Sequence, residues 1–389
     1  MTRTIVIFST YAPSEEFGGP ARIFHMRRVI ERRGHRVSHV VIDTDGVRGA
    51  TTANDLRITA STRTRPIDHL YTDVELGATV GADQHQVDKV VAYLRRQRAD
   101  LVILEQPFLV PVVRRALAQV PIPVLYSCQN VEYQLRKDLE QFSPMRTRSP
   151  LRYEEVRALE IEAVAMSAAV TSICTSDQTR LQLDFGVESV VVPNGSTVAE
   201  ARLDLQHQRD HAYFAFAGSS YWPNTEGFAD IATPSLAFLP PNVRIEICGS
   251  VCKALLDHRR LLNHSDINLA RMSMNGFVPM NELIGLMVNS IAVLVPVFLG
   301  EGSNLKSADA LACGAPVIMT RRATHGYEDV LAIDDEGVTV VDTPAEFRAA
   351  MKLAVATGRP SGLVGAKRRQ MLAWSNRLQP LATLIETLG

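Results

Sequence analysis

The residues from 301 to 317, EGSNLKSADALACGAPV, combine the groups that bind a phosphate and a sugar. Two carboxylates, Glu301 and Asp309, stand eight positions apart with Lys306 between them. A loop that enters a helix exposes N–H groups and the positive end of the helix dipole, which favour an anion, and a lysine adds a full positive charge. The carboxylates could bind hydroxyls of a sugar or ribose. The stretch therefore predicts a sugar-nucleotide site, with N–H groups from Gly302, Ser303, Asn304 and Leu305.

Parallel sheets must position these residues, because short β-branched runs alternate with helical patterns along the chain. In the first half we expect strands at Thr4–Phe8, Arg36–Ile42, Leu101–Leu104, Val124–Ser127, Ala169–Ile173 and Ser189–Val192. In the second half we expect them at 212–216, 243–248, 273–274, 291–296, 316–319 and 338–341. Residues 45–85 show little periodicity and are interpreted as an irregular excursion.

The alternating pattern breaks once, at Pro193, and the polar residues after it contain no strand pattern. A second series of strands then starts as the first did. We therefore predict a first domain over 1–195, a linker over 196–210, a second domain over 211–362 and a helical segment over 363–389. Two Rossmann-like halves in series would place a cleft at the carboxyl ends of their strands.

The stretch that starts at Glu301 resembles the Glu-x7-Glu signature of retaining GT-B glycosyltransferases of family-four type, the group 1 glycosyltransferases. Asp309 stands in place of the second Glu, and Lys306 matches a variant of the family with a lysine five positions after the first acid. The resemblance extends over nearly the whole chain. It implies an α/β fold of GT-B architecture, with two Rossmann-like domains facing a central cleft. The first domain would bind the acceptor, the second the nucleotide sugar, and the terminal helices would cross back to the first.

Two segments of the first domain also resemble the family. Gly18-Gly19 precedes a helix that starts with proline, and resembles the glycine loop that faces the donor diphosphate; the alternative is a tight turn. Gln129-Asn130 follows a buried strand and resembles a His-Asn-x-Glu segment, with Gln129 at the position of the family histidine beside the donor sugar. A glutamine can donate and accept hydrogen bonds but cannot take up a proton. We predict Gln129 and Asn130 on the acceptor side, with an inert turn as the alternative.

Two segments of the second domain complete the predicted donor site. The turn Gly218–Asn224, which contains Ser219, occupies the place where many relatives carry an Arg and a Lys that grip the diphosphate, and it contains neither. Lys306 is therefore the best candidate for the counter-charge. The segment after the strand at 273–274 resembles the one whose backbone contacts the nucleotide base, and its predicted donor-binding residues are Gly276, Phe277 and Val278.

The net charge, the N-terminal residues and the cysteine spacing of the chain argue against several classes of function. The formal net charge of the 389-residue chain is -1, which gives no general attraction to nucleic acid. The apolar run at the N-terminus is too short for a signal peptide, and the five cysteines show no metal-ligand spacing. We therefore expect a cytoplasmic protein without bound metal or cofactor. The helix over 20–33 carries several arginines, which are either a solvated face or a patch for an anionic membrane surface or a phosphate-bearing acceptor.

The predicted activity is transfer of a sugar from a nucleoside diphosphate to a hydroxyl of a glycan, lipid or natural product, with retention of configuration, as in polysaccharide biosynthesis. As the resemblance implies, Glu301 would hold the donor sugar, Lys306 would stabilise the leaving diphosphate, Asp309 would bind the ribose and Gln129 would contact the sugar. Two alternatives stay open: another GT-B enzyme, such as a sugar-nucleotide epimerase, and a non-catalytic binder of sugar nucleotides.

Overall fold

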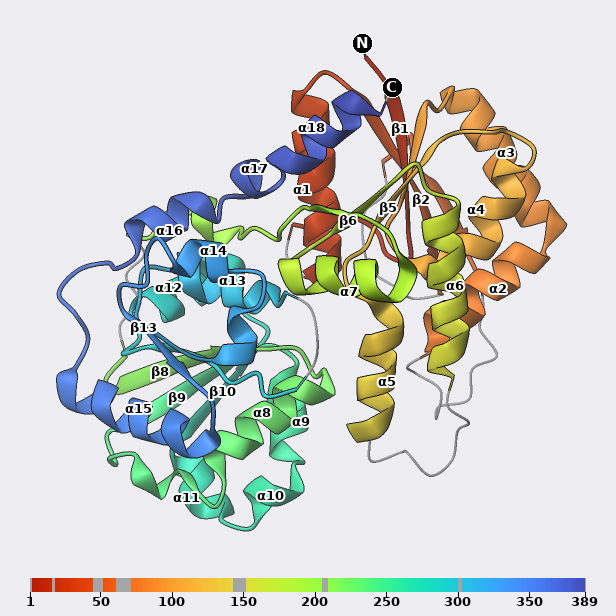
Figure 1. Ribbon diagram of the computed structural model, residues 1–389. Coiled ribbons are helices and arrows are strands. Elements are labelled where there is room, and N and C mark those ends of the chain that lie inside the picture. Colours follow the sequence, from red (N-terminus) through yellow and green to blue (C-terminus); the bar gives the residue numbers. More distant parts are fainter. Residues whose placement is uncertain are drawn as a thin grey trace. The chain divides into compact units, whose positions relative to one another are not determined.

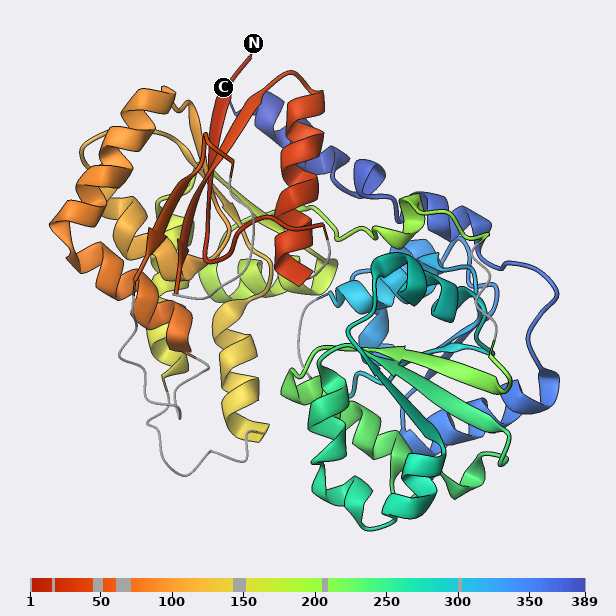
Figure 2. The ribbon, with the colours of Figure 1, turned by 180° about the vertical axis from the view of Figure 1, so that it is seen from behind.

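The computed structural model describes residues 2–15, 18–44, 52–60, 71–142, 152–204, 209–299 and 303–388. It divides into two compact units, one formed by Met1–Pro193 with Leu378–Gly389 and the other by Asn194–Arg377. Each unit contains one parallel sheet with helices on both faces (Figures 1 and 2). This is the Rossmann-like α/β class predicted from the sequence.

The first unit is built on a seven-stranded sheet of order β3-β2-β1-β4-β5-β6-β7. Its strands are β1 (Thr4–Ser9), β2 (Arg36–Asp43), β3 (Leu56–Thr59), β4 (Leu101–Leu104), β5 (Val124–Ser127), β6 (Ala169–Ser172) and β7 (Val190–Val191). Its helices are α1 (Gly18–Arg32), α2 (Thr72–Ala82), α3 (Gln84–Gln97), η2 (Pro107–Leu109), α4 (Val110–Leu117), α5 (Glu132–Phe142), α6 (Tyr153–Ala165), α7 (Thr175–Phe185) and α18 (Gln379–Thr387). Helices α1 and α18 lie on one side of the sheet, and α2, α3, α4 and α6 lie on the other (Figures 1 and 2).

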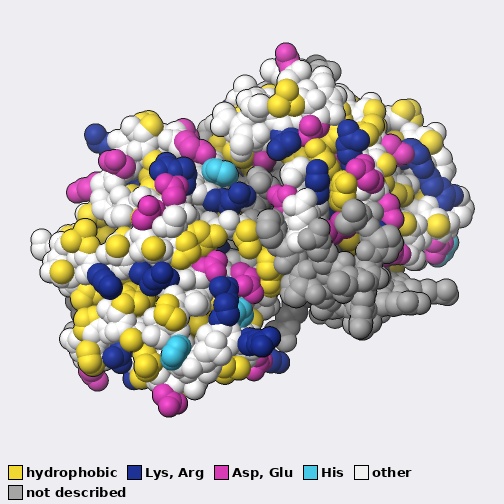
Figure 3. Space-filling model, turned by 60° about the horizontal axis from the view of Figure 1, so that its bottom comes forward, with side chains coloured by type: hydrophobic (Ala, Val, Ile, Leu, Met, Phe, Trp, Pro, Cys, Tyr) yellow, Lys and Arg dark blue, Asp and Glu magenta, His cyan; other side chains and the backbone are white. Residues whose placement is uncertain are grey.

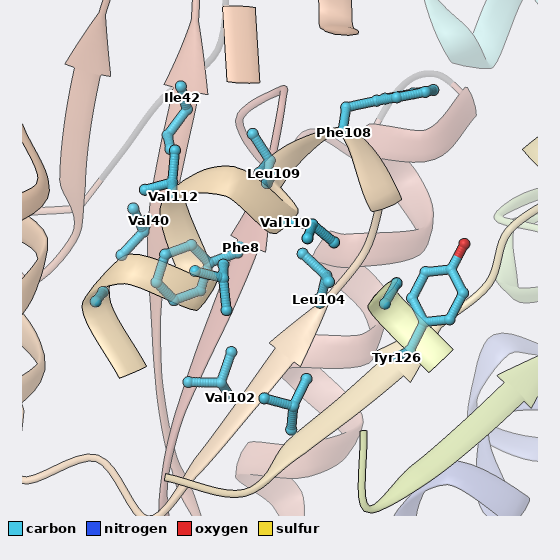
Figure 4. Packing of buried hydrophobic residues seen from close by; sticks show 14 of the residues in the cluster. Phe8, Val40, Ile42, Val102, Leu104, Phe108, Leu109, Val110, Val112 and Tyr126 are labelled. Carbon is cyan, nitrogen blue, oxygen red and sulfur yellow. The ribbon is translucent and has the colours of Figure 1, made fainter. Parts of the chain in front are cut away.

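The core of the first unit explains why its strands read as continuous apolar runs. Every residue of β1 and β4 is buried, because helices cover both faces of a parallel sheet. Side chains of β1, β2 and β4 meet those of η2 and α4 in a single cluster (Figure 4). Its labelled members are Phe8, Val40, Ile42, Val102, Leu104, Phe108, Leu109, Val110, Val112 and Tyr126.

The second unit is built on a six-stranded sheet of order β10-β9-β8-β11-β12-β13. Its strands are β8 (Ala212–Ala217), β9 (Val243–Cys248), β10 (Met272–Gly276), β11 (Val293–Val295), β12 (Val317–Thr320) and β13 (Val338–Val341). Its longer helices are α8 (Trp222–Ala232), α12 (Met280–Val288), α13 (Leu305–Ala312) and α15 (Pro344–Thr357), and its shorter ones are α9 (Val251–Leu256), α10 (Arg259–Leu262), α11 (Ser265–Ala270), α14 (Glu328–Leu331), α16 (Ala366–Met371), α17 (Trp374–Arg377), η3 (Val198–Glu200), η4 (Leu236–Phe238) and η5 (Arg321–Thr324). Helices α12 and α13 lie on one side of the sheet and α8, α9 and α15 on the other (Figure 1).

The chain leaves the first unit at Pro193 and returns to it only at Leu378. Ser196, the first residue of the predicted linker, is hydrogen-bonded within the second unit: its N–H donates to Leu372 O at 2.8 Å. Helices α16 and α17 also belong to the second unit, and α18 alone joins the first. There Arg3 Nη1 donates to Ile385 O at 2.8 Å, and Leu381, Ala382 and Ile385 are buried.

The interpretation of residues 45–85 as irregular is wrong for its described part. Strand β3 pairs in parallel with the outer edge of β2, and α2 packs on α4 and η2. The short strand has only one buried residue, Ile58, so it lacks the apolar run of the inner strands. In α2, Gly77 and Gly81 weaken the helical signal, since glycine is a poor helix former. Packing on neighbouring elements overrides both local deficits.

Candidate functional site

The sheet of the second unit has a topological switch point between β8 and β11. From β8 the chain adds strands towards β10, and from β11 it adds them in the opposite direction, towards β13. Open α/β sheets bind ligands outside the carboxyl ends of the strands at such a point. Helix α13 follows β11, and the turn after β8 leads into α8, so Lys306 and Asn224 meet at this place.

Lys306 is a cation that lies largely enclosed by protein. Its Nζ donates to the Asn224 Oδ1, a neutral acceptor. Burial alone lowers the pKa of Lys306 from its ordinary value of 10.5 to about 7. Within the described ranges, no carboxylate acts on its pKa. A charge removed from water without a counter-charge is costly, so an anion that reached Lys306 would be strongly favoured.

The N-terminus of α13 adds further groups for an anion. Asn304 is the N-cap residue, and its side chain makes no capping bond. Ser307 N–H donates to Asn304 O at 2.9 Å, and in the part of the chain that the structure describes no side chain caps the N–H groups before it. The backbone before it is held in place: Tyr327 Oη donates to Asn304 O at 3.0 Å, and Asn194 Nδ2 donates to Ser303 O at 3.3 Å. In the described part of the chain, the buried hydroxyl oxygens of Ser303 and Ser307 have no hydrogen-bond partner.

Asn224 was missed by the sequence reasoning, although it links Lys306 to the turn after β8. Its Nδ2 donates to Ser219 O at 3.1 Å and to Ser219 Oγ at 3.2 Å, while its Oδ1 accepts from Lys306. Lys306 and Ser219, two predicted donor-binding residues, are thereby brought together. The sequence signal for this contact was the absence of a basic residue from the turn after β8, where the neutral amide of Asn224 faces Lys306.

Asp309 lies on the same helix, one turn beyond Lys306, and is partly buried. Ser196 Oγ donates to its Oδ1 at 2.7 Å, and that hydroxyl accepts from Val198 N–H at 3.0 Å. Burial raises the pKa of Asp309 to about 6, although the Ser196 bond lowers it. One carboxylate oxygen is thus used within the protein, and the contact of Asp309 with ribose stays a prediction.

Turns after three neighbouring strands, β8, β9 and β10, form a shallow hollow beside this site. Gly249 N–H donates to Gly276 O at 2.6 Å, and a side chain on Gly249 would collide with Gly218 O. The glycine is therefore required for the close approach of the β8 and β9 turns. Gly276 and the exposed Phe277 line the hollow, whereas Val278 is partly buried and packs against a small cluster of buried residues that includes Leu286. Its other lining residues are Ser220, Gly249, Ser250, Cys252, Lys253, Ala254 and Asp257.

The remaining predicted residues of the donor stretch, Glu301 and Gly302, lie outside the described residues. Leu305 is the first residue of α13, which places its N–H at the end of the helix as predicted. The roles assigned to these residues stay predictions.

In the first unit, the predicted glycine loop forms the start of α1. Gly18 has a positive φ of 50°, a conformation that favours glycine. Gly19 lies under the ring of Tyr11, and a side chain there would collide with the Tyr11 hydroxyl. The second glycine thus has a packing role beside any role towards an oxyanion.

Gln129 and Asn130 lie after β5, at the carboxyl edge of the first sheet. Gln129 is partly exposed; its Nε2 donates to Glu105 Oε2, and its Oε1 accepts from Tyr11 Oη at 3.0 Å. The Asn130 side chain donates to Glu132 Oε1 at 3.1 Å, a local bond that shapes the turn before α5. The structure therefore brings Gln129, but not the Asn130 amide, into a network with side chains from other loops.

Several arginines of α1 and of the turn after it are occupied within the protein. Arg22 is buried, with an exposed fraction of 1%. Arg27 pairs with Glu31 at 2.8 Å and Arg33 with Glu386 at 3.2 Å, while Arg28 Nη1 lies 3.8 Å from Glu15. On the face that Figure 3 shows, Lys and Arg side chains lie interspersed with Asp and Glu side chains. Pairing of this kind favours the solvated-face interpretation of this helix.

Within the described ranges, no group of three or more His, Cys, Asp or Glu side chains is arranged to hold a metal ion. None of the helices described is both long enough and apolar enough to cross a membrane. All five cysteines are buried as free thiols.

Comparison with known proteins identifies the second unit. Residues 212–356 match the sequence family described as glycosyl transferases, group 1. This unit carries a group 1 glycosyltransferase domain. The matched range contains β8, α8, α13 and β13, and with them Ser219, Asn224, Lys306 and Asp309. No curated protein sequence matches the chain.

Solved structures show that the whole chain has the GT-B fold. Sucrose-phosphate synthase from Thermosynechococcus elongatus is similar with a TM-score of 0.72 and 16% identity, over 99% of both chains. WaaG, a glycosyltransferase involved in lipopolysaccharide biosynthesis, matches with a TM-score of 0.62 and 16% identity, over 97% of this chain and 95% of its own. Anabaena HepE in complex with UDP-glucose matches at 0.65 and 15% identity, over 99% and 100%. The predicted fold and family resemblance are confirmed.

Proposed function

We propose that this protein is a retaining glycosyltransferase that moves a sugar from a nucleoside diphosphate to a hydroxyl of an acceptor. The observation that carries the proposal is Lys306, an enclosed cation with a neutral partner, at the N-terminus of α13 in a group 1 glycosyltransferase domain. A diphosphate supplies the missing negative charge. HepE, which shares the fold, has been captured with UDP-glucose, and this supports a sugar nucleotide as the ligand.

The leaving diphosphate would be stabilised by Lys306 and by the first N–H groups of α13. During transfer the bond from the anomeric carbon to the phosphate oxygen breaks, and charge develops on that oxygen. Fixed donors aimed at developing charge lower the barrier, since they need no reorganisation. In this proposal the lysine and the helix dipole supply the positive charge that a metal ion supplies elsewhere.

The acceptor hydroxyl would attack the same face of the sugar from which the diphosphate departs, so configuration is retained. Its oxygen bonds to the anomeric carbon, and its proton passes to the leaving phosphate oxygen. No protein base is required by this scheme, which is consistent with a glutamine at position 129. Gln129 would hydrogen-bond the sugar, Glu301 would hold donor hydroxyls, and Asp309 would bind the ribose.

The hollow formed by the turns after β8, β9 and β10 would take the base. It lies beside the Ser219 turn, and Phe277 at its rim offers an exposed aromatic face. Aromatic faces stack on bases with little selectivity, so the hollow by itself does not select one nucleotide. The acceptor would be a glycan, lipid or natural product, as in polysaccharide biosynthesis, and the protein would work in the cytoplasm.

Ligand screening followed by turnover tests the proposal. Melting temperatures are measured with UDP-, GDP- and ADP-sugars, because a ligand that binds the folded state raises the melting temperature. Transfer and hydrolysis of the best donor are then followed. Lys306→Met should lower turnover about 10²- to 10³-fold, as expected for the loss of one transition-state donor, and Lys367→Ala, at an exposed lysine of the same unit, should not.

Each result has a defined meaning. Stabilisation by a sugar nucleotide with transfer or slow hydrolysis supports the proposal. Interconversion of sugar nucleotides without acceptor would identify an epimerase, and binding without turnover would identify a sugar-nucleotide binder. Wild-type turnover in Lys306→Met would overturn the assignment of Lys306.

A further inference from the structure

A chain of four side-chain hydrogen bonds lies at the switch point of the first sheet, between β1 and β4. Gln106 Oε1 accepts from Thr10 N–H at 3.1 Å, and Gln106 Nε2 donates to Tyr11 Oη at 2.6 Å. Tyr11 Oη donates to Gln129 Oε1 at 3.0 Å, and Gln129 Nε2 donates to Glu105 Oε2. The members come from the loops after β1, β4 and β5.

The two ends of this series of hydrogen bonds fix which atom donates and which accepts in every bond. At one end a backbone N–H can only donate, so Gln106 must turn its oxygen towards Thr10 and its nitrogen towards Tyr11. Tyr11 then accepts from Gln106 and has its own proton to give to Gln129. At the other end the Glu105 carboxylate can only accept, so it also requires the nitrogen of Gln129. The orientation of the Gln129 amide follows from the network.

Glu105 is well placed to fix the orientation of the Gln129 amide, because it is almost completely buried. Its exposed fraction is 1%, as is that of Arg22 on α1. The pKa of Glu105 is raised, because burial outweighs the opposite effects of the Arg22 guanidinium and the bond from Gln129. The carboxyl is therefore a poor candidate for direct contact with a substrate. Gln129, in contrast, is partly exposed.

We propose that Glu105, together with Tyr11, positions Gln129 so that its second N–H is presented to an oxygen of the sugar. Among the described residues that N–H has no hydrogen-bond partner. This inference rests on the proposed function and deepens it by naming positioning residues for the contact. Holding a glutamine in one rotamer before binding removes an entropy cost that the complex would otherwise bear.

The kinetic test uses two conservative variants and their combinations with Gln129→Ala. Glu105→Gln keeps the shape of the side chain but can offer an N–H to Gln129, so the Gln129 amide is free to flip. Tyr11→Phe removes two bonds, the one from Gln106 and the one to Gln129. We expect Glu105→Gln to lower kcat/KM about 10- to 100-fold, the range for one lost hydrogen bond to a charged group, and Tyr11→Phe about 2- to 10-fold, the range for a bond between neutral groups. In the Gln129→Ala background neither should lower it further, since residues that act through one contact are not additive.

The matched control is Tyr93→Phe. Tyr93 has an exposed fraction of 1% and donates to Asn54 O at 2.6 Å within the same unit, so it tests the loss of a buried hydroxyl away from the network. It should lower the melting temperature without changing kcat/KM. Wild-type kinetics in Glu105→Gln and Tyr11→Phe, or losses that add fully to that of Gln129→Ala, would overturn the proposal.

A spectroscopic arm separates this inference from the proposed function. In protein with 15N-labelled glutamine side chains, the Gln129 carboxamide is assigned by its loss in Gln129→Ala. Its two N–H resonances should be widely separated in the wild type, because only one proton faces a carboxylate, and should move together in Glu105→Gln. Unchanged resonances in Glu105→Gln overturn the positioning role even if the enzyme transfers sugar. An inactive wild type with the expected resonances would instead refute the proposed function and support the arrangement of the network.

Discussion

Lys306 should make the binding of a sugar nucleotide depend on pH near neutrality. Burial holds its pKa at about 7 in the free protein, so half of the molecules carry the charged lysine at pH 7. That share falls to about a tenth at pH 8 and about a hundredth at pH 9. If only the charged form binds the diphosphate, the apparent Kd rises in inverse proportion to that share.

Calorimetric titration measures this linkage directly. A sugar nucleotide is the right probe, because its diphosphate is doubly esterified and does not itself titrate in this range. The Kd should be nearly constant below pH 6.5 and rise about tenfold for each pH step above 7. At pH 8, titrations in buffers of different ionisation enthalpy should report uptake of about 0.9 proton per bound ligand.

The variant Lys306→Met provides the control, since it keeps an unbranched side chain one atom shorter than that of lysine and removes the titrating group. It should bind weakly at every pH without proton uptake. Without ligand, the stability of the wild type should rise with pH, although its affinity for the ligand falls. Lys306 keeps its proton up to about pH 10.5 in the unfolded chain but loses it near pH 7 in the folded protein. The free energy of unfolding of the wild type should therefore rise relative to that of the variant between pH 7 and 10. An affinity that stays level from pH 6.5 to 8.5 would refute this reasoning.

Three further outcomes are expected. Activity should survive EDTA, and loss on chelation that Mg²⁺ or Mn²⁺ restores would reveal a metal site. Gln129→Ala should lose about 1–3 kcal/mol of transition-state stabilisation by single-turnover transfer, and Gln129→His should retain substantial activity; a rate about 10²-fold above wild type would show that a base is needed there. Sedimentation with vesicles should not increase with the share of anionic lipid, because ion pairs engage Arg27 of α1 and Arg33 just after it; a salt-sensitive increase would restore the membrane interpretation.

Local sequence patterns were enough to predict features that depend on a single helix or strand. The buried runs of β1 and β4 were recognisable because parallel strands are apolar on both faces. The position of Lys306 on the first turn of α13 followed from the loop before it and from the glycine and proline after the helix. The weak patterns of β3 and α2 gave no such signal, because their stability comes from neighbouring elements.

Contacts between distant residues could not be predicted from one sequence. Asn224 and Lys306 are 82 positions apart, and Tyr11 and Gln129 are 118 apart. Neither pair shows a periodic pattern, and asparagine and tyrosine also serve as turn and core residues. Arg22 shows the same limit: basic helix residues are expected to face water, yet this one is buried near Glu105.

The return of α18 to the first unit has a consequence for biosynthesis. The ribosome releases β1 to β7 long before it makes α18, yet Leu381, Ala382 and Ile385 are buried in that unit and Arg3 binds the carbonyl of Ile385. The first unit to be synthesised is thus the last to be completed. The second unit is synthesised as one uninterrupted segment between the two parts of the first, which waits for α18 with an open flank beside α1.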